Sequence, residues 1–494
     1  MGSLFVAAAI RSYLLWQYYC ISSDGVFYLR AAEEFFAGDI KAGLGSVYPP
    51  GYPLLIAAAY PLFGDWELAG QGLSLLFGVA LLFPLYGLFR EVLGDKIALL
   101  GCYLAGVSPF LALYSVHVRS ESTYLFLSTS SLCLFASALT RKSVGRFFLG
   151  GIVAGFAYLV RPEAIGFMVI VPAVLLFHWW RRENHFPWLI QSVAALALGF
   201  LLFALPFIVY LSIDTGQFGA ISRKAGVTWA LNLQKSGMLN DDVDSQGVDV
   251  NSFSFTDYLL QHPLLYAQKV ASDVPAAIAA FFEAVHYSYM PFLLLGVFVL
   301  ARRDDWLGPQ LFLIGTVLFY VVGFALIYVK RRYSLQAVPI SLAWVALGIW
   351  WAWDKAQLAL PARKAQLVAL SVLAVFLGAT LPKTLRAVSR EKAYVREAGW
   401  YLKARNKDGS LRVAALDDRV TFYAGAKIVP LDKIEASQIA DYFRQQRVVY
   451  FAAESKIFAQ ILPEVSRQPE AYGLVLEKSF IGTRNDRMLL FKVT

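Results

Sequence analysis

One acidic residue, Asp24, lies just beyond the first apolar run, in the segment SSDGVFYLRAAEEFFAGD. The run before it, LFVAAAIRSYLLWQYYCI, is long enough to cross a bilayer. A carboxylate within hydrogen-bond reach of a hydroxyl proton can act as a general base. Capping is the alternative, because Ser22, Ser23 or Asp24 could each begin the helix that follows. The sequence therefore makes Asp24 a candidate base.

Other charged side chains lie at the ends of expected membrane helices, where burial is costly and ionisable groups are candidates for function. These are Arg119 with Glu121, Arg161 with Glu163, and the run Lys330, Arg331 and Arg332. Arginine binds phosphate oxygens through a planar fork, so the basic members are candidates for holding a lipid-borne anion. Anchoring to anionic headgroups is the alternative for residues 330–332. For Arg161 the alternative to phosphate binding is a structural ion pair with Glu121 or Asp24. The same choice between a functional and a structural role applies to Arg119 and Glu121.

Other residues give weaker signals. His286, in EAVHYSYMP, could orient a substrate or could be a satisfied interfacial histidine. The acidic residues Asp241, Asp242, Asp244 and Asp249 lack the spacing of a calcium loop, which favours a solvated loop. The three cysteines have no metal-like spacing. No cofactor is predicted, and nothing in the sequence indicates a divalent metal. The absence of a Walker A, Rossmann or zinc-helix motif argues against nucleotide use.

Composition indicates a polytopic helical membrane protein. The 494 residues are 58% hydrophobic with a mean hydropathy of +0.55, and only 16% are charged, against about a quarter in globular chains. About eleven apolar runs are expected to span the bilayer. They are 4–21, 68–89, 97–117, 121–139, 147–160, 162–179, 188–212, 287–301, 308–329, 334–353 and 365–382.

Basic residues orient these spans. Arginines and lysines gather in alternate short loops, at 90–96, 141–146, 181–182, 302–303 and 355–364, which are therefore expected to face the cytoplasm. The net charge of +9 is explained in this way without nucleic acid. Asp24 and the other candidate charges then face away from the cytoplasm, on a multi-pass protein of the cell (inner or plasma) membrane. The first span is expected to be retained rather than cleaved.

Two long outer segments, 22–67 and 213–286, interrupt the spans of a transmembrane domain over residues 1–386. The first contains an amphipathic helical pattern and then YPPGYPLLIAAAYPLFGD, which is too short to span and indicates a surface or re-entrant helix. The second contains a helical run in HPLLYAQKVASDVPAAIAAFF.

Composition changes after residue 386. VREAGWYLKARN favours a helix, and LRVAALD, RVVYFAA and MLLFKVT favour strands. Residues 387–494 are therefore expected to form a soluble, extracytoplasmic α/β domain.

Four segments resemble the superfamily of C-type membrane glycosyltransferases, and most closely the family of protein O-mannosyltransferases and the lipid A aminoarabinose transferase. Asp24, Tyr28, Ala31 and Gly38 are similar to its pattern after the first span, and YPPGYPLL is similar to its proline-rich juxtamembrane helix. LAGVSPF…HVRSES with GGIVAGFAYLVRPEA, and KRRYSLQAVPISLAW, are similar to later elements. The chain departs from the family pattern at two positions. Gly25 stands where many members have Glu. Some relatives have an acidic residue late in the loop between the third and fourth spans, and Glu121 is the nearest equivalent in this chain.

The resemblance implies transfer of a sugar from a polyprenyl-phosphate donor to an extracytoplasmic lipid, glycan or protein acceptor, with inversion at the anomeric carbon. Asp24 would be the catalytic base. Lys330, Arg331, Arg332 and Arg161 would bind the donor phosphate, and Tyr28, Arg119, Glu121, Glu163 and His286 would support the site or the acceptor. A lipid-linked saccharide flippase or transporter and an oligosaccharide ligase are the alternatives. A transporter is expected to show paired halves with polar residues at the membrane midplane, and this chain instead gathers charge at one surface.

Overall fold

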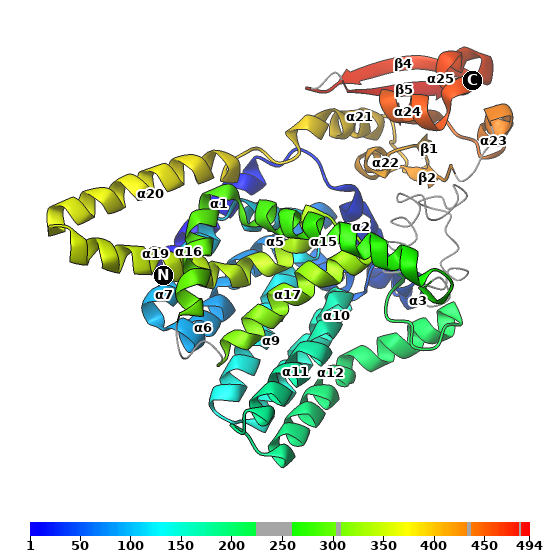
Figure 1. Ribbon diagram of the computed structural model, residues 1–494. Coiled ribbons are helices and arrows are strands. Elements are labelled where there is room, and N and C mark those ends of the chain that lie inside the picture. Colours follow the sequence, from blue (N-terminus) through cyan, green and yellow to red (C-terminus); the bar gives the residue numbers. More distant parts are fainter. Residues whose placement is uncertain (224–258, 303–307, 432–435, 484–485) are drawn as a thin grey trace. The chain divides into compact units, whose positions relative to one another are not determined.

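The structure, a computed structural model, describes residues 1–223, 259–302, 308–431, 436–483 and 486–494 (Figure 1). The acidic stretch from Asp241 to Asp249 lies outside the described residues. The chain folds into two units, each with its own interior. The helical unit contains Met1–Leu14 and Ala31–Arg386, and the α/β unit contains Leu15–Arg30 and Ala387–Thr494.

Helices account for nearly all regular structure in the helical unit (Figure 1). They are α1 (Gly2–Trp16), the end of α2 (Ser23–Phe36), α3 (Ile40–Leu44), α4 (Gly51–Phe63), α5 (Trp66–Ala80), α6 (Leu82–Leu93), α7 (Asp95–Val107), α8 (Pro109–Tyr114), α9 (Glu121–Thr140), α10 (Val144–Val160), α11 (Phe167–Trp180), α12 (Phe186–Thr215), α15 (Pro263–Val285), α16 (Met290–Ala301), α17 (Gln310–Ile327), α18 (Arg331–Ser334), α19 (Val338–Ala359) and α20 (Ala362–Thr384). Short 3-10 helices cover Pro162–Gly166, Tyr287–Tyr289 and Leu335–Ala337.

The predicted polytopic helical fold is confirmed. Among the described residues, seven helical segments are long and apolar enough to cross a membrane, or eight if a pair bent by 86° after Val285 forms one span. Among three shorter apolar helices, Gly2–Trp16 and Val144–Val160 overlap predicted spans, and Gly51–Phe63 overlaps the predicted surface or re-entrant helix. The count of about eleven spans therefore stays a prediction.

Pro109 divides one predicted span into two helices, a break that hydropathy does not predict. The apolar run 97–117 is divided into α7 and α8, because Pro109 begins the second helix and its ring disfavours helical backbone at the preceding residue. Ser108 is accordingly extended, with φ −62° and ψ 124°.

Arg11 lies inside the first apolar run, where a long basic side chain could extend toward a headgroup. The side chain is instead buried, and its guanidinium donates to the carbonyl oxygens of Ala7 at 3.2 Å and Gly106 at 3.1 Å. Hydrogen bonds to two helices thus satisfy part of the charge inside the protein.

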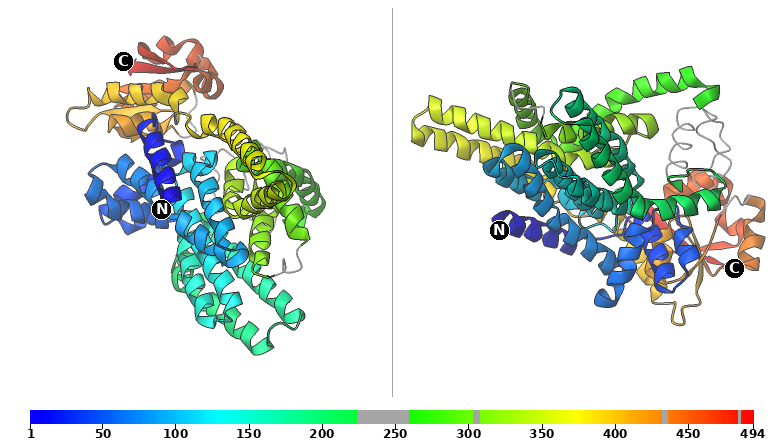
Figure 2. Two further views of the ribbon diagram at one scale, coloured as in Figure 1. Left: turned by 90° about the vertical axis from the view of Figure 1, so that its left-hand side faces the viewer. Right: turned by 90° about the horizontal axis from the view of Figure 1, so that it is seen from below.

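Close packing fixes the position of α10. The helices α10 and α12 lie side by side (Figure 2), and small residues line the contact. A Cβ atom added at Gly151 would lie 2.4 Å from the Leu196 carbonyl oxygen, and one added at Gly155 would lie 2.4 Å from the Phe200 carbonyl oxygen. Only glycine permits this approach. The packing matters for the candidate site because Arg161 directly follows α10.

The α/β unit contains a five-stranded sheet in the order β2-β1-β3-β5-β4. Strands β1, β2 and β3 are parallel to one another, and β5 pairs antiparallel with both β3 and β4. The strands are β1 (Arg412–Ala415), β2 (Lys427–Val429), β3 (Tyr450–Glu454), β4 (Leu474–Ile481) and β5 (Arg487–Val493). The helices are the start of α2, then α21 (Ala393–Lys403), α22 (Asp418–Ala424), α23 (Ile439–Gln445), α24 (Ser455–Ile461) and α25 (Pro463–Arg467), with 3-10 turns at Arg390–Lys392, Ala436–Gln438 and Pro469–Tyr472.

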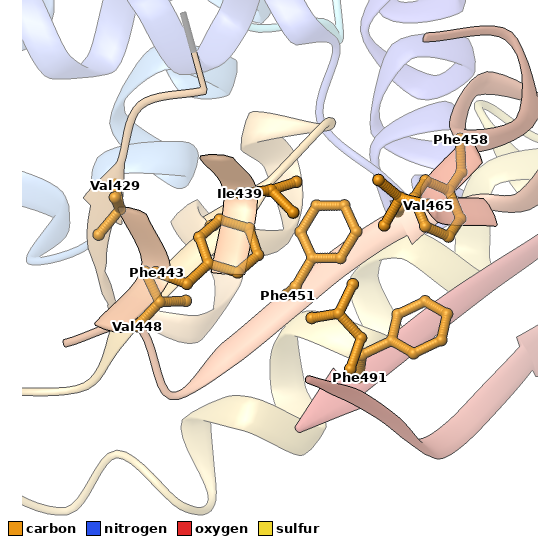
Figure 3. Close-up of a cluster of buried hydrophobic side chains, with 11 residues drawn as sticks. Val429, Ile439, Phe443, Val448, Phe451, Phe458, Val465 and Phe491 are labelled. Carbon is orange, nitrogen blue, oxygen red and sulfur yellow. The ribbon is translucent and has the colours of Figure 1, made fainter. Parts of the chain in front are cut away.

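Four phenylalanines, Phe443, Phe451, Phe458 and Phe491, pack among aliphatic side chains in the core of this unit (Figure 3). Phe451 on the central strand β3 lies with its ring centroid 5.6 Å from that of Phe443 on α23 and 5.3 Å from that of Phe458 on α24. All three are buried. The predicted helix near 395–406 and the three predicted strands form, whereas β2 and β4 were not predicted.

Candidate active site

Asp24 lies in the first turn of α2 and is half-buried. The residue before this helix, Ser22, accepts a hydrogen bond on its hydroxyl oxygen from the Gly25 amide at 3.1 Å. Ser22 therefore supplies the cap, and the Asp24 carboxylate is not needed for that role. A negative charge in the first turn is also favoured by the helix dipole. Tyr28 is buried one turn further along, on the same side of α2.

A buried ion cluster joins the first turn of α9 to the end of α10. Proline again explains the local geometry: Pro162 holds Arg161 in extended backbone, with φ −151° and ψ 130°, and so ends α10. The Arg161 guanidinium lies 3.2 Å from a Glu121 carboxylate oxygen and 2.7 Å from a Glu163 carboxylate oxygen. Glu121 and Arg161 are each 4% exposed.

The start of α18 adds to the same cluster. Nε of Arg332 lies 3.8 Å from the Glu121 carboxylate, and the Gln336 amide donates to the Glu163 carboxylate at 3.2 Å. We call these residues, with Arg161, the Glu121 cluster. Two guanidinium groups oppose two carboxylates, so the charges cancel within the protein. Such a set of paired charges holds the helix ends together.

A separate pocket of about 830 Å³ opens beside Arg331, and we call it the Arg331 pocket. Its walls are mainly apolar, and its charged or titratable members are Arg331, Lys383, Glu283 and His286. The remaining lining residues are Phe110, Ala279, Phe282, Tyr287, Met290, Gly378, Ala379 and Pro382.

Among the described residues, the two cations of this pocket have no carboxylate within ion-pair distance. The Arg331 guanidinium lies over the Phe110 ring, 4.7 Å from its centroid. Within the described parts of the chain, neither Arg331 nor Lys383 forms an ion pair with a carboxylate within 4.0 Å. Two cations therefore face one carboxylate, Glu283, across an amphiphilic cavity. This arrangement suits an anion attached to an apolar chain.

His286 lies in this pocket at the bend between α15 and α16. Its φ of 80° is rare for a residue other than glycine. The ring is buried, its Nδ1 lies 2.8 Å from the Ser288 hydroxyl, and that hydroxyl lies 2.9 Å from the hydroxyl of Thr380. A chain of polar contacts thus fixes the imidazole against α20.

The remaining predicted cations lie elsewhere. Lys330 is exposed, with its ammonium 4.6 Å from the centroid of the Tyr328 ring, and it is not among the residues that line the Arg331 pocket. Arg119 is half-buried, with its guanidinium 5.8 Å from the Tyr114 ring centroid. Its carbonyl oxygen accepts from the Ser74 hydroxyl at 3.3 Å.

Three polar members of these sites are not predicted from the sequence: Lys383, Gln336 and Glu283. Lys383 ends the last apolar run on the face where few cations are expected, and residues 330–332 were selected by that same signal. Gln336 follows Arg332 by four residues, a spacing that places both on one side of a helix. Over the described residues, no group of three or more histidine, cysteine or acidic side chains gathers in a way that could hold a metal ion.

Comparisons with known proteins agree with this architecture. Residues 47–210 match the family described as dolichyl-phosphate-mannose-protein mannosyltransferase. The fold is similar to that of ArnT from Cupriavidus metallidurans, with a TM-score of 0.58 at 14% identity over 99% of this chain and 97% of that one. It is also similar to the oligosaccharyltransferase of Archaeoglobus fulgidus, with a TM-score of 0.62 at 14% identity over 99% of this chain and 72% of that one. Among curated protein sequences no match is found.

The family match over residues 47–210 and the shared fold support the resemblance to C-type membrane glycosyltransferases that the sequence predicted.

Proposed function

We propose that the protein transfers a sugar from a polyprenyl-phosphate donor to an acceptor on the outer side of the membrane. The family match over residues 47–210 is the observation that carries this proposal. Two proteins of similar fold support the donor class, since one was solved with undecaprenyl phosphate and the other with dolichol phosphate. The outer orientation follows from the basic alternate loops. The acceptor is a lipid, a glycan or a protein.

The chemistry assigns Asp24 the role of general base. An acceptor hydroxyl would lose its proton to the Asp24 carboxylate and attack the anomeric carbon. The bond from that carbon to the phosphate oxygen would break, and the phosphate would leave with the bonding electrons. Attack from the face opposite the leaving group inverts the anomeric carbon.

Arg331 and Lys383 would hold the departing phosphate. Positive charge aimed at an oxygen that gains negative charge stabilises the transition state more than the ground state. The apolar walls of the Arg331 pocket would contact the first carbons of the polyprenyl chain. Within the Glu121 cluster, Arg161 and Arg332 would support the site by fixing helix ends, because their charges are already matched by Glu121 and Glu163.

The test is incubation of the purified protein with defined polyprenyl-phosphate sugars, followed by measurement of released polyprenyl phosphate and of saccharide transfer. We expect release with one sugar class, and a loss of at least about a hundredfold in kcat for Asp24→Asn with normal folding. Movement of the intact lipid across the bilayer without release would instead indicate a flippase. Activity only with diphosphate-linked oligosaccharides would indicate a ligase, and near-full activity of Asp24→Asn would remove it as the base.

A further inference from the structure

The segment that carries Asp24 packs with the C-terminal part of the chain. Residues Leu15–Arg30 form one compact unit with Ala387–Thr494, although they follow directly on α1 of the helical unit. Tyr18 and Val388 form a parallel bridge, in which the Tyr19 amide donates to the Val388 carbonyl and the Val388 amide donates to the Gln17 carbonyl, both at 3.0 Å. The chain thus enters this unit twice, through paired backbone.

One short helix of that unit, α22, contacts the Asp24 segment before and after the carboxylate. On the N-terminal side, the buried Ile21 amide donates to the Tyr423 hydroxyl at 2.7 Å. On the C-terminal side, the Arg30 guanidinium lies 3.3 Å from an Asp418 carboxylate oxygen and donates to the Thr421 hydroxyl at 3.4 Å. Asp24 therefore lies between two attachments to the same helix.

The helix α22 is itself firmly held. Asp417 caps its start by accepting from the Arg419 amide at 3.1 Å, and its two carboxylate oxygens also accept from the Arg419 guanidinium. Along its side, α22 lies so close to α21 that a Cβ added at Gly399 would lie 2.4 Å from the Tyr423 Cβ. Movement of α22 is therefore restricted by the strand before it and the helix beside it.

We propose that the C-terminal part of the α/β unit positions the catalytic base, and that Tyr423 and Asp418 are positioning residues that act through residues 21–30. The proposal rests on the proposed function, in which Asp24 removes the acceptor proton. A general base contributes fully only when its oxygen is held within hydrogen-bond reach of that proton, and a displacement of about 1 Å can cost two orders of magnitude in rate. The C-terminal residues would thus belong to the catalytic machinery rather than only recruit the acceptor.

Two variants test the two attachments, each with a matched control from the same unit. Tyr423→Phe removes the hydroxyl that the Ile21 amide needs, and Asp418→Asn removes the charge opposite Arg30. Tyr442→Phe removes a hydroxyl that donates to the Pro430 carbonyl at 2.7 Å, and Asp441→Asn removes a carboxylate 3.2 Å from Arg444. Both control contacts join residues that lie after position 429, away from the Asp24 segment in the chain.

We expect Tyr423→Phe to lower kcat by about tenfold and Asp418→Asn by about threefold, while KM for the donor stays within about twofold. Amide hydrogen exchange of the full chain should accelerate at residues 21–30 in both variants and stay unchanged at β3. Replacing both charges, Arg30→Asp with Asp418→Arg, should recover part of the kcat lost in Asp418→Arg alone. Variants that match their controls in exchange and kcat would overturn the proposal.

Failure of the proposed function gives a different pattern. If Asp24→Asn transfers sugar normally while Tyr423→Phe still accelerates exchange at residues 21–30, then the attachment exists but the base assignment is wrong. If Asp24→Asn is inactive while exchange and kcat of Tyr423→Phe equal those of Tyr442→Phe, the base is right and the positioning role is wrong. The exchange measurement needs no substrate, so it decides the attachment in either case.

Discussion

Arg331 and Arg332 are consecutive residues in opposite surroundings. The Arg332 guanidinium faces the Glu121 carboxylate in a cluster where acids and bases balance, and its side chain is 19% exposed. Arg331 is exposed, lies over an aromatic ring and shares a pocket with Lys383 and one carboxylate, Glu283. Arg332 has its counter-charge within the protein, whereas Arg331 has room and charge for a ligand.

Charged residues at these helix ends therefore occur in two different settings. In the Glu121 cluster, taking charges out of water costs free energy that is recovered only through close pairing, so the cluster is a structural joint. In the Arg331 pocket, the cations are exposed to solvent, and we propose that they bind an external anion. An arginine identified by sequence alone cannot be assigned to either class, because both occur at helix ends.

Removing one charge from the Glu121 cluster should have the largest effect, a loss of stability. Arg161→Ala removes the guanidinium between Glu121 and Glu163, and we expect it to lower the free energy of unfolding by about 3–5 kcal/mol. Thermal unfolding in detergent measures this loss. The double variant Arg161→Met with Glu121→Gln removes one charge of each sign and should cost clearly less. Equal stability of Arg161→Ala and wild type would mean that the cluster is not a structural joint.

Removing the pocket arginine should affect binding rather than stability. Arg331→Ala should weaken binding of the donor by about tenfold or more, because a charge-assisted hydrogen bond is worth about 1.5–3 kcal/mol. Donor titration against the purified protein measures the change. Arg302→Ala is the matched control, since Arg302 also lies over an aromatic ring, 3.9 Å from the Phe298 centroid. Equal losses in the two variants would remove Arg331 from the donor site.

Two exposed lysines, Lys383 and Lys330, test which residues belong to the Arg331 pocket. Lys383 lines it and Lys330 does not, so Lys383→Ala should weaken donor binding by about fivefold and Lys330→Ala by less than about twofold. The same donor titration reports both values. The reverse order would shift the phosphate toward Lys330 and away from the cavity.

Much of the helical architecture could be predicted from the sequence, because the length of an apolar run and the basic loops beside it depend directly on the bilayer. The residues that make up each charged site could not be predicted. The Glu121–Arg161 pair joins residues 40 positions apart and was only an alternative to phosphate binding. The packing of residues 15–30 against α22 depends on contacts such as Ile21 with Tyr423, about 400 residues away, which no local pattern encodes. In the sheet, β2 has only three residues, and most of β4 is exposed, so neither gives a hydrophobic run.

A smaller effect than that of Arg331→Ala is expected when only the shape of the cation in the pocket is changed. Arg331→Lys keeps the charge but loses the planar fork, so donor binding should weaken by about threefold, less than in Arg331→Ala. The loss should be the same in neutral and anionic bilayers. If lysine replaces arginine freely and the Ala penalty depends on the anionic lipid content, Arg331 is only a headgroup anchor.

The most direct measurement is the affinity of sugar-free polyprenyl phosphate for the wild type and for the double variant Arg331→Ala with Lys383→Ala, in neutral bilayers. Competition with an anionic phospholipid and with inorganic phosphate separates the lipid phosphate from other sources of the same charge. We expect the double variant to bind polyprenyl phosphate about fiftyfold more weakly, with unchanged thermal stability. Unchanged affinity in a folded double variant would contradict the division between a structural cluster and a ligand pocket.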